Sequence, residues 1–240
     1  KTAGKLYVAG VHSHAFDRAA ARDGLARLTG CAKDVPLNET DIVIEAIVEN
    51  IDIKREVLAQ IEKRMLVNSV IATNTSALSI NELASSLMYP ERFIGIHFFN
   101  PVHKMKLVEI VKGVATDDET IDKAVRFVQK IGKFPVVVKD SPGFVVNRIL
   151  MPYLLDAASV LQSGYSCEDV DKSVVKFGMP MGPFRLMDEI GLDICYHVAC
   201  DLMKRLHFFD IDAAGIQELV NRIGQGNLGK KTGEGFYKYT

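Results

Sequence analysis

An apolar run around residue 45 constrains the fold of this chain more than any other feature. The run reads DIVIEAIVE from Asp41 to Glu49, and its β-branched residues are nearly continuous. Such a run is typical of a parallel strand buried on both faces, because a half-exposed strand would alternate apolar and polar residues. Residues 53–66 follow with apolar side chains close to helical spacing and charges between them. A buried strand followed by an amphipathic helix predicts an α/β layered sheet.

The same alternation of strand-like and helix-like segments continues up to residue 139. Residues 79–87 begin with Ser79-x-x-Glu82, which is a plausible capping box for a short helix. Residues 119–131 are amphipathic and predict another helix. Further strands are predicted at 69–74, 93–96, 107–111 and 135–139.

Beyond Asp140 the pattern becomes helical. The turn Ser141-Pro142-Gly143 comes first, and loops rich in glycine and proline separate the long segments after it. We therefore predict an α/β domain at residues 1–139 and an all-helical domain at residues 140–240. The helices are predicted at 144–163, 166–177, 184–206 and 215–223.

The first 40 residues allow two interpretations. In one, Lys5-LYVAG is a first strand. In the other, which we favour, residues 1–28 form a helical hairpin whose second arm is the amphipathic segment 14–28. Neither interpretation places a Gly-x-Gly-x-x-Gly motif after a strand near the N-terminus.

A glycine pattern near the C-terminal end matches the dinucleotide fingerprint in its residue spacing but not in its structural context. It reads Gly224-Gln-Gly226-Asn-Leu-Gly229. The fingerprint requires a preceding strand and a following helix, because the helix N-terminus binds the pyrophosphate. Here the preceding segment is helical and the following one is interrupted by glycine. We therefore predict a terminal loop.

Composition argues against several classes of protein. The formal net charge is −1, so no basic surface for nucleic acid stands out. No segment approaches the ~18 uncharged apolar residues of a membrane span, and the N-terminal apolar run is too short for a signal peptide. The four cysteines lack zinc-ligand spacing, and His12-x-His14 has no partner at ligand spacing apart from Asp17. We expect a cytoplasmic protein, or a mitochondrial-matrix protein in a eukaryote, with no metal site.

The residues best suited to catalysis gather in the segment Gly95–Glu109, which reads GIHFFNPVHKMKLVE. His97 follows one predicted strand and Glu109 lies in the next, so the two can pair between neighbouring strands. A His–carboxylate pair transfers protons near neutral pH, since the carboxylate fixes the tautomer of the imidazole and raises its basicity. The alternative is a hydrogen-bonded core histidine beside an edge-strand charge, and spacing alone does not separate the two.

Two more polar residues stand at element ends that can converge on this pair. Ser76 follows one predicted strand, and Asn147 lies at the start of the first long helix of the second domain. Ligands of open α/β sheets bind outside the carboxyl ends of the strands, and a second domain packed over that edge would close a cleft. Each residue also has a purely structural interpretation, Ser76 as a turn or cap residue and Asn147 as a polar residue of a first helical turn.

Six motifs, in order along the chain, resemble the 3-hydroxyacyl-CoA dehydrogenases, including the short-chain 3-hydroxybutyryl-CoA enzymes. The resemblance runs from about residue 24 to the C-terminus. The motifs are Asp41-IVIEAIVEN, Thr73-NTSALSI, Gly95-IHFFNPVHKMKLVEIV, Asp140-SPGFVVNRILMPYL, Met179-PMGPFRLMDEIGLD and Gly229-KKTGEGFYKY.

The resemblance implies an NAD-dependent enzyme that oxidises a 3-hydroxyacyl-CoA to a 3-oxoacyl-CoA or runs the reverse. It also implies a Rossmann-type dinucleotide-binding domain followed by an all-α domain that forms a homodimer. His97 would be the general base, Glu109 would hold it and stabilise its imidazolium, and Ser76 and Asn147 would hydrogen-bond the substrate oxygens. Contacts on the nicotinamide side would come from Ala46, Glu49, Lys54, Ser76, Asn100 and Lys231.

The sequence departs from this family at its beginning. The family opens with a strand, a glycine-rich turn, a helix and a second strand whose acid binds the adenosine ribose, and the residues before 41 show none of these. We therefore expect a truncated Rossmann-type domain without its N-terminal half. Only part of the helical hairpin that grips CoA in the family would be present, in residues 1–28. Two explanations compete: a fragment of a longer enzyme, which we favour, and a non-catalytic dimerising remnant that has lost cofactor binding.

Overall fold

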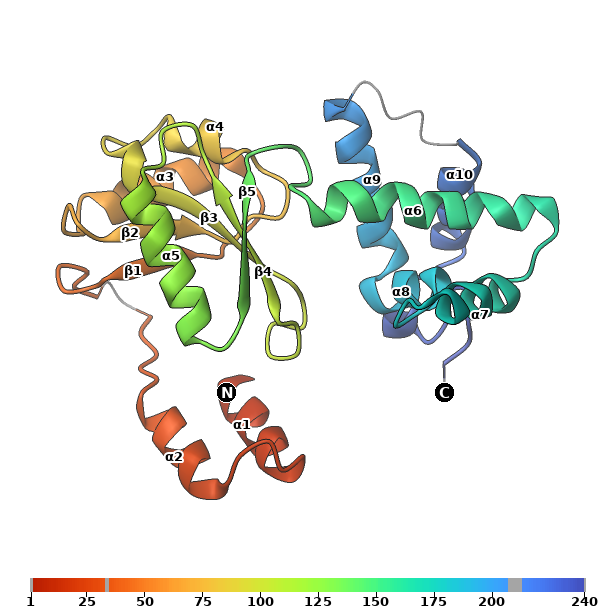
Figure 1. Cartoon of the computed structure of the whole chain (residues 1–240), viewed down its shortest axis with the longest axis horizontal. Coiled ribbons are helices and arrows are strands. Elements are labelled where there is room, and N and C mark those ends of the chain that lie inside the picture. The colour runs from red at the N-terminus through yellow and green to blue at the C-terminus, as the bar shows by residue number, and fades with distance from the viewer. Residues whose placement is uncertain (1, 33–34, 207–212, 240) are drawn as a thin grey trace. The chain divides into compact units, whose positions relative to one another are not determined.

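The computed structural model describes residues 2–32, 35–206 and 213–239 (Figure 1). The chain divides into two compact units, residues 1–38 and 39–240. In the first unit, α1 (Thr2–His12) and α2 (Arg18–Ala26) form a helical hairpin. The predicted hairpin is confirmed, apart from Lys1, which lies outside the described residues, and the alternative strand at Lys5 is wrong.

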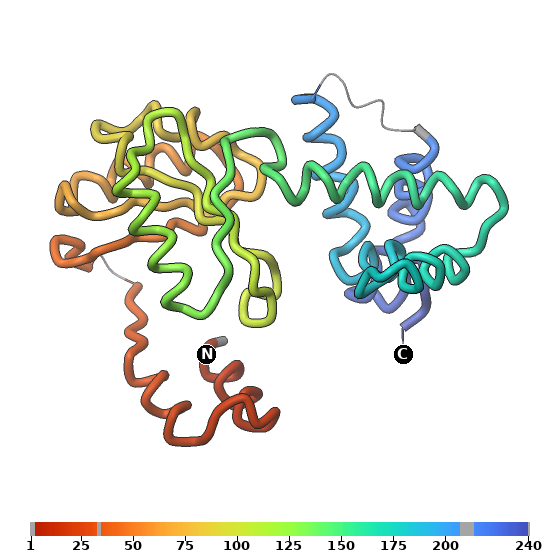
Figure 2. Tube along the Cα trace, viewed as in Figure 1, coloured from red at the N-terminus to blue at the C-terminus, as the bar shows by residue number. Residues whose placement is uncertain are grey.

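The second unit contains a five-stranded sheet in the order β1-β2-β3-β4-β5. Neighbouring strands run parallel except β3 and β4, which are antiparallel. Figure 2 follows the chain through the sheet into the helices that come after it. The fold is therefore a Rossmann-like α/β sheet followed by an all-helical part. The strands are β1 (Ile42–Glu45), β2 (Val70–Thr73), β3 (Phe93–Phe98), β4 (Leu107–Lys112) and β5 (Phe134–Lys139).

Strand β1 is shorter than the apolar run predicts, because it ends at Glu45 and does not continue to Glu49. The carboxylate of Glu45 accepts a hydrogen bond from the Ile47 amide at 2.6 Å, which turns the chain out of the strand. Asn50 then caps helix α3 (Ile51–Glu62) by accepting from the amides of Asp52 and Ile53. Polar side chains thus end the strand and begin the helix within a run that is otherwise apolar.

Helix α5 (Asp118–Lys130) covers one face of the sheet (Figure 1). Its buried Ala124 and Val128 pack on inward side chains of β2, β3 and β4, including Ile94 and Ile96. Side chains alternate between the two faces of a strand, so Gly95 and His97 point to the opposite face. That face is the one on which the candidate site is built.

Helix α4 (Ile80–Ala84) packs on the face of Gly95 and His97. A Cβ atom on Gly95 would lie 2.8 Å from Ile80 Cδ1 and 2.9 Å from Val111 Cβ, so glycine is needed there for the close approach. Ser79 caps this helix by accepting from the Glu82 amide at 3.2 Å, as the sequence predicts. α3 in turn contacts α4.

The helical part has its own core, formed around Leu154, Phe184, Met187, Ala199 and Leu219. The predicted helix 184–206 is two helices, because Gly191 adopts φ +103°, a left-handed conformation that interrupts the helix. The glycine pattern at 224–229 forms a loop between α10 and a short 3₁₀ turn. The helices are α6 (Val146–Val160), α7 (Cys167–Phe177), α8 (Pro183–Ile190), α9 (Leu192–Arg205) and α10 (Ala213–Gly224).

Candidate active site

His97 and Glu109 form a direct pair across strands β3 and β4. The antiparallel register sets the two residues opposite each other, and His97 Nδ1 lies 2.8 Å from Glu109 Oε2. Both residues are buried, with 5% of His97 and 1% of Glu109 exposed. His97 lies within β3 rather than past its end as predicted, because the strand continues to Phe98. This extension brings the histidine into register with its carboxylate partner.

The second carboxylate oxygen of Glu109 binds the start of helix α6. Oε1 accepts hydrogen bonds from the backbone amides of Val145 and Val146, both at 2.9 Å. The N-cap residue Val145 makes no side-chain capping bond of its own, so Glu109 supplies the cap from the sheet. A helix N-terminus carries partial positive charge, so the carboxylate of Glu109 interacts favourably with the start of α6.

Two aromatic rings flank the imidazole of His97. The Phe99 ring centroid lies 4.5 Å away, and that of Phe144 lies 5.6 Å away in an edge-on orientation. Phe144 is buried and adopts φ +50°. A proton on Nδ1 donated to Glu109 leaves the lone pair on Nε2, which is the tautomer that a general base requires. Glu109 and the two aromatic rings together hold the imidazole in one orientation.

Ser76 lies in a turn that Glu49 holds in place. Glu49 Oε1 accepts from the Thr75 hydroxyl at 2.5 Å, from the Ser76 amide at 3.0 Å and from the Ala77 amide at 3.2 Å. The Asn74 side-chain oxygen just before this turn accepts from the Phe98 amide at 2.9 Å. The turn after β2 is thereby tied to the end of β3, next to His97.

Asn147 is the second residue of α6 and directly follows the Val146 amide that Glu109 binds. It is partly buried. Of the four predicted catalytic residues, the structure joins His97 and Glu109 directly, ties Ser76 to the end of β3 through its turn, and connects Asn147 through the backbone of α6.

Lys54 is fully buried and has two acidic partners. Its Nζ lies 2.7 Å from Glu45 Oε1 and 3.5 Å from Glu49 Oε2. Glu45 was not among the predicted site residues, although an acid in the middle of an apolar run is the signal that would have identified it. Lys54 therefore pairs with the carboxylates of Glu45 and Glu49 in this structure.

The remaining predicted cofactor residues are dispersed. Ala46 and Asn100 are exposed in the loops after β1 and β3. Lys231 lies in the helical part, where its Nζ pairs with Asp193 at 2.5 Å. Burial opposes ionisation of Asp193, but the hydrogen bond and charge of Lys231 hold the pKa of Asp193 below its ordinary value. Within the described residues, no hydrogen bond or ion pair joins Lys231 to the other predicted site residues.

Comparison with known proteins identifies the family. Residues 2–141 match the NAD binding domain of 3-hydroxyacyl-CoA dehydrogenase, and residues 143–239 match its C-terminal domain. The chain belongs to the 3-hydroxyacyl-CoA dehydrogenase family. The predicted resemblance is thus confirmed, and the NAD-binding domain of this family implies NAD as the cofactor.

Solved structures of similar proteins agree with the family. The (S)-3-hydroxybutyryl-CoA dehydrogenase of Ralstonia eutropha is 39% identical with a TM-score of 0.88, over 96% of this chain and 82% of that chain. FadB2 of Mycobacterium tuberculosis is 34% identical with a TM-score of 0.90, over 98% and 84% of the two chains. The 3-hydroxybutyryl-CoA dehydrogenase of Escherichia coli is 34% identical with a TM-score of 0.88, over 99% of this chain and 51% of that chain.

The residues at the carboxyl ends of the parallel strands fit a dinucleotide of this family. Glu49, Ser76 and Asn100 follow β1, β2 and β3 in turn, and all three are exposed. Open α/β sheets bind their ligands at this edge.

Within the described ranges, no group of three or more His, Cys, Asp or Glu side chains is placed to hold a metal ion. No described helix combines the length and apolar character needed to cross a membrane.

Proposed function

We propose that this chain carries the acid–base machinery for NAD-dependent interconversion of a short-chain 3-hydroxyacyl-CoA and its 3-oxoacyl-CoA, such as 3-hydroxybutyryl-CoA and acetoacetyl-CoA. The observation that supports this most strongly is the buried His97–Glu109 pair, 2.8 Å apart, with Glu109 also bound to the start of α6. Substrate identity is inferred from the family and its short-chain relatives.

In the proposed mechanism, His97 Nε2 takes the proton from the substrate 3-hydroxyl as the C3–H bond breaks. NAD, when bound, supplies the hydride-accepting chemistry. Glu109 stabilises the imidazolium that forms, because its carboxylate faces Nδ1 at 2.8 Å. In the reverse direction the imidazolium returns the proton to the 3-oxo oxygen. Ser76 and Asn147 hydrogen-bond the substrate oxygens and orient C3.

Glu49, Ser76 and Asn100 would hold the nicotinamide side of the cofactor, together with Ala46, Lys54 and Lys231. The first three are supported by their exposed positions after the parallel strands. Lys54 acts through Glu45 and Glu49 rather than by direct contact, since it is fully buried. Lys231 would have to leave its ion pair with Asp193 to reach the cofactor.

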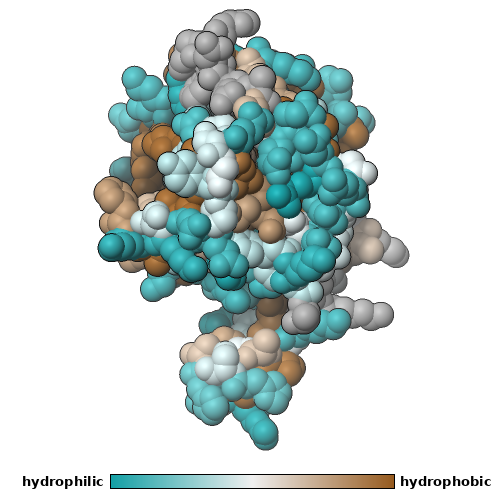
Figure 3. All heavy atoms as spheres, turned by 90° about the vertical axis from the view of Figure 1, so that its right-hand side faces the viewer, coloured by the Kyte–Doolittle hydropathy of each residue, from teal (hydrophilic) through white to brown (hydrophobic). Residues whose placement is uncertain are grey.

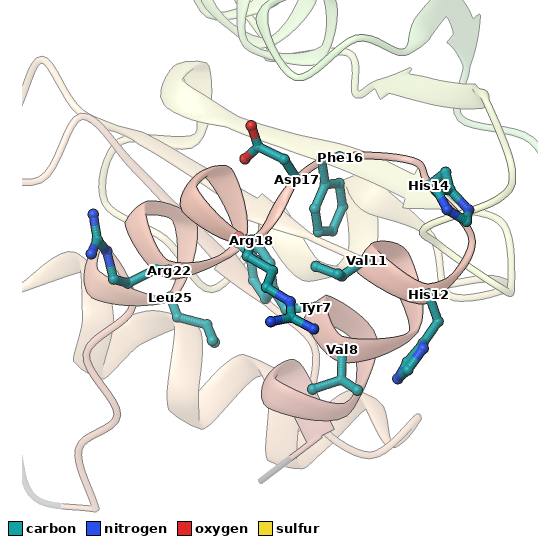
Figure 4. Close-up of a pocket in the computed structure, with 11 residues that line it drawn as sticks. Tyr7, Val8, Val11, His12, His14, Phe16, Asp17, Arg18, Arg22 and Leu25 are labelled. Atoms are coloured by element: carbon teal, nitrogen blue, oxygen red, sulfur yellow. The ribbon is translucent and has the colours of Figure 1, made fainter.

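The CoA portion of the substrate is assigned to the helical hairpin. An open pocket of about 1000 Å³ lies between α1 and α2 of the hairpin. Figure 4 shows Arg18 and Arg22 of α2 beside it, with Val8 and His12 of α1 on the other side. Guanidinium groups bind phosphate oxygens and apolar walls accept a planar base, which suits an adenine nucleotide.

The helical part is proposed to form a homodimer, with functional domains at 1–139 and 140–240. An apolar groove of about 660 Å³ runs between α6 and α7, lined by Val145, Ile149, Val174 and Phe177 among others. Figure 3 shows apolar side chains among polar ones on the side of the molecule that faces the viewer. Exposed apolar patches of this kind mark association surfaces. Sedimentation of Phe177→Asp against the parent protein tests the proposal, since a dimer formed here would dissociate.

The test of the reaction is oxidation of NADH in the presence of acetoacetyl-CoA. A His97→Gln variant keeps a side chain of similar size but has no basic nitrogen, so turnover is expected to fall by about 10²- to 10⁴-fold. Calorimetry with NADH reports cofactor binding separately from turnover. Undiminished turnover in the variant would rule out His97 as the base, and a parent protein that neither binds NADH nor turns over would favour the non-catalytic remnant.

A further inference from the structure

A buried ionic cluster lies where β1 and β2 end, on the same edge of the sheet as the candidate site. Glu45 is its centre. Oε1 of Glu45 accepts from Lys54 Nζ at 2.7 Å and from the Ile47 amide at 2.6 Å, and Oε2 accepts from the Thr73 hydroxyl at 2.6 Å. The side chains of Glu45 and Lys54 are each 1% exposed. Glu45 is thus shielded from solvent while it binds three different segments.

Lys54 connects this cluster to the turn that carries Ser76. Its Nζ lies 3.5 Å from Glu49 Oε2, while the other oxygen of Glu49 accepts from Thr75, Ser76 and Ala77. A continuous series of contacts therefore runs from Glu45 through Lys54 and Glu49 to the Ser76 amide.

The charges of Glu45, Lys54 and Glu49 determine how these contacts rearrange when one partner is changed. A buried ammonium group needs a counter-charge, because removal of one partner leaves an unpaired charge at high cost. Glu45 supplies that charge at 2.7 Å, whereas Glu49 is farther away and 41% of its side chain is exposed. Without the charge on Glu45, Lys54 would draw Glu49 toward itself and away from the amides of Ser76 and Ala77.

We propose that Glu45 is a positioning residue for the dehydrogenase reaction. It fixes Lys54, which lets Glu49 hold the Thr75–Ser76 turn and sets where the Ser76 hydroxyl points. This inference rests on the proposed function, in which Ser76 orients substrate and cofactor. Glu45 itself is shielded from solvent, so in this proposal it acts through Lys54 and Glu49.

The direct test compares Glu45→Gln with Glu62→Gln. Glutamine keeps the size of the side chain at position 45 and removes its charge. Glu62 is the matched control, because it is also a buried acid of the same unit but binds the amides of Met88 and Tyr89 and lies 3.8 Å from Arg92. Thermal unfolding, NADH calorimetry and steady-state kinetics with acetoacetyl-CoA are measured for each variant.

In Glu45→Gln, kcat is expected to fall about 10- to 100-fold, because small misplacements of positioning groups lower turnover by such factors. The change in KM for acetoacetyl-CoA should be smaller. The pH profile should keep its shape, because the His97–Glu109 pair is untouched. Glu62→Gln should unfold at a lower temperature but retain kcat within about twofold, since its partners Met88, Tyr89 and Arg92 are not part of the Ser76 turn. Equal losses of kcat in both variants, or full kcat in Glu45→Gln, would overturn the inference.

Amide hydrogen exchange of residues 74–78 tests the same link without turnover. Glu45→Gln should raise exchange at the Ser76 and Ala77 amides, which Glu49 now protects, and Glu62→Gln should not. Unchanged exchange would refute the inference. A parent protein without turnover would refute the proposed function alone, because the exchange result stands independently.

Thr73→Val provides a milder variant if Glu45→Gln does not fold. It removes the hydroxyl that donates to Glu45 Oε2 and leaves the Glu45–Lys54 pair in place. An intermediate loss of kcat and a partial rise in exchange at 74–78 are expected. Parent-like values of both would contradict the proposed role of Glu45.

Discussion

Glu109 divides its carboxylate between His97 and the first turn of helix α6. One oxygen lies 2.8 Å from the imidazole Nδ1, and the other accepts two backbone amides at 2.9 Å. The His97–Glu109 pair and the start of the helical part therefore share one side chain. A change at Glu109 should affect both catalysis and the stability of α6.

Glu109→Gln is expected to lower kcat by about 10²- to 10⁴-fold, because the imidazolium loses its counter-charge. Loss of the charged cap should also lower the free energy of unfolding by about 0.5–2 kcal/mol. Kinetics and urea unfolding measure the two effects. Glu119→Gln is the control, since Glu119 is an exposed acid on α5 whose partner is Lys123. If both variants keep parent kcat, the pair has no catalytic role.

Gly95→Ala should destabilise the sheet unit by about 1–3 kcal/mol through overpacking. The added Cβ would lie 2.8 Å from Ile80 Cδ1 and 2.9 Å from Val111 Cβ. Ile80→Val in the same chain removes the Cδ1 atom, so the double variant should regain part of the loss in urea unfolding. Additive losses in the double variant would show that Ile80 is not the limiting contact.

Gly191→Ala should cost more than Gly178→Ala, although both glycines have positive φ. A Cβ on Gly178 would meet nothing within 4 Å, whereas one on Gly191 would lie 2.9 Å from both Asp193 Oδ1 and Lys231 Nζ. Backbone strain alone costs about 1–3 kcal/mol. The additional loss of unfolding free energy in Gly191→Ala measures the disturbance of the Asp193–Lys231 pair. Equal unfolding free energies for the two variants would contradict this expectation.

The C-terminal tail should make the protein sensitive to alkaline pH. Tyr237 donates to Asp171 and Tyr239 donates to Asp188, each at 2.9 Å. Burial, then the hydrogen bond to the neighbouring carboxylate, raises the pKa of both phenols above the ordinary value of 10.0. The folded state therefore holds these protons more tightly than the unfolded state.

The sign of the effect follows from proton linkage. The stabilisation is fully present below pH ~10 and is lost as the pH rises further, because the unfolded chain then binds fewer protons. Urea unfolding between pH 8 and about 11 measures the decline. The double variant Tyr237→Phe/Tyr239→Phe should lose less unfolding free energy as the pH rises. An undiminished decline in this variant would assign the pH dependence to other groups.

Much of the fold could be predicted from local sequence. The hairpin, the short helix capped by Ser79 and helix α5 all appear near their predicted bounds, because caps and amphipathic spacing act over a few residues. The ends of β1 and β3 could not be predicted in the same way. Glu45 ends β1 through its own contacts with Ile47, Lys54 and Thr73, and apolar composition does not reveal such bonds.

The sequence by itself determined the strand–helix alternation, the family, and the residue types of the candidate site. Only the tertiary structure decided that His97 lies in register with Glu109, that Glu109 also caps a helix 36 residues away, and that Lys54 is buried between two acids. The physical reason is that strand register and the partner of a buried charge depend on segments brought together by folding, and neither leaves a period or spacing in the chain.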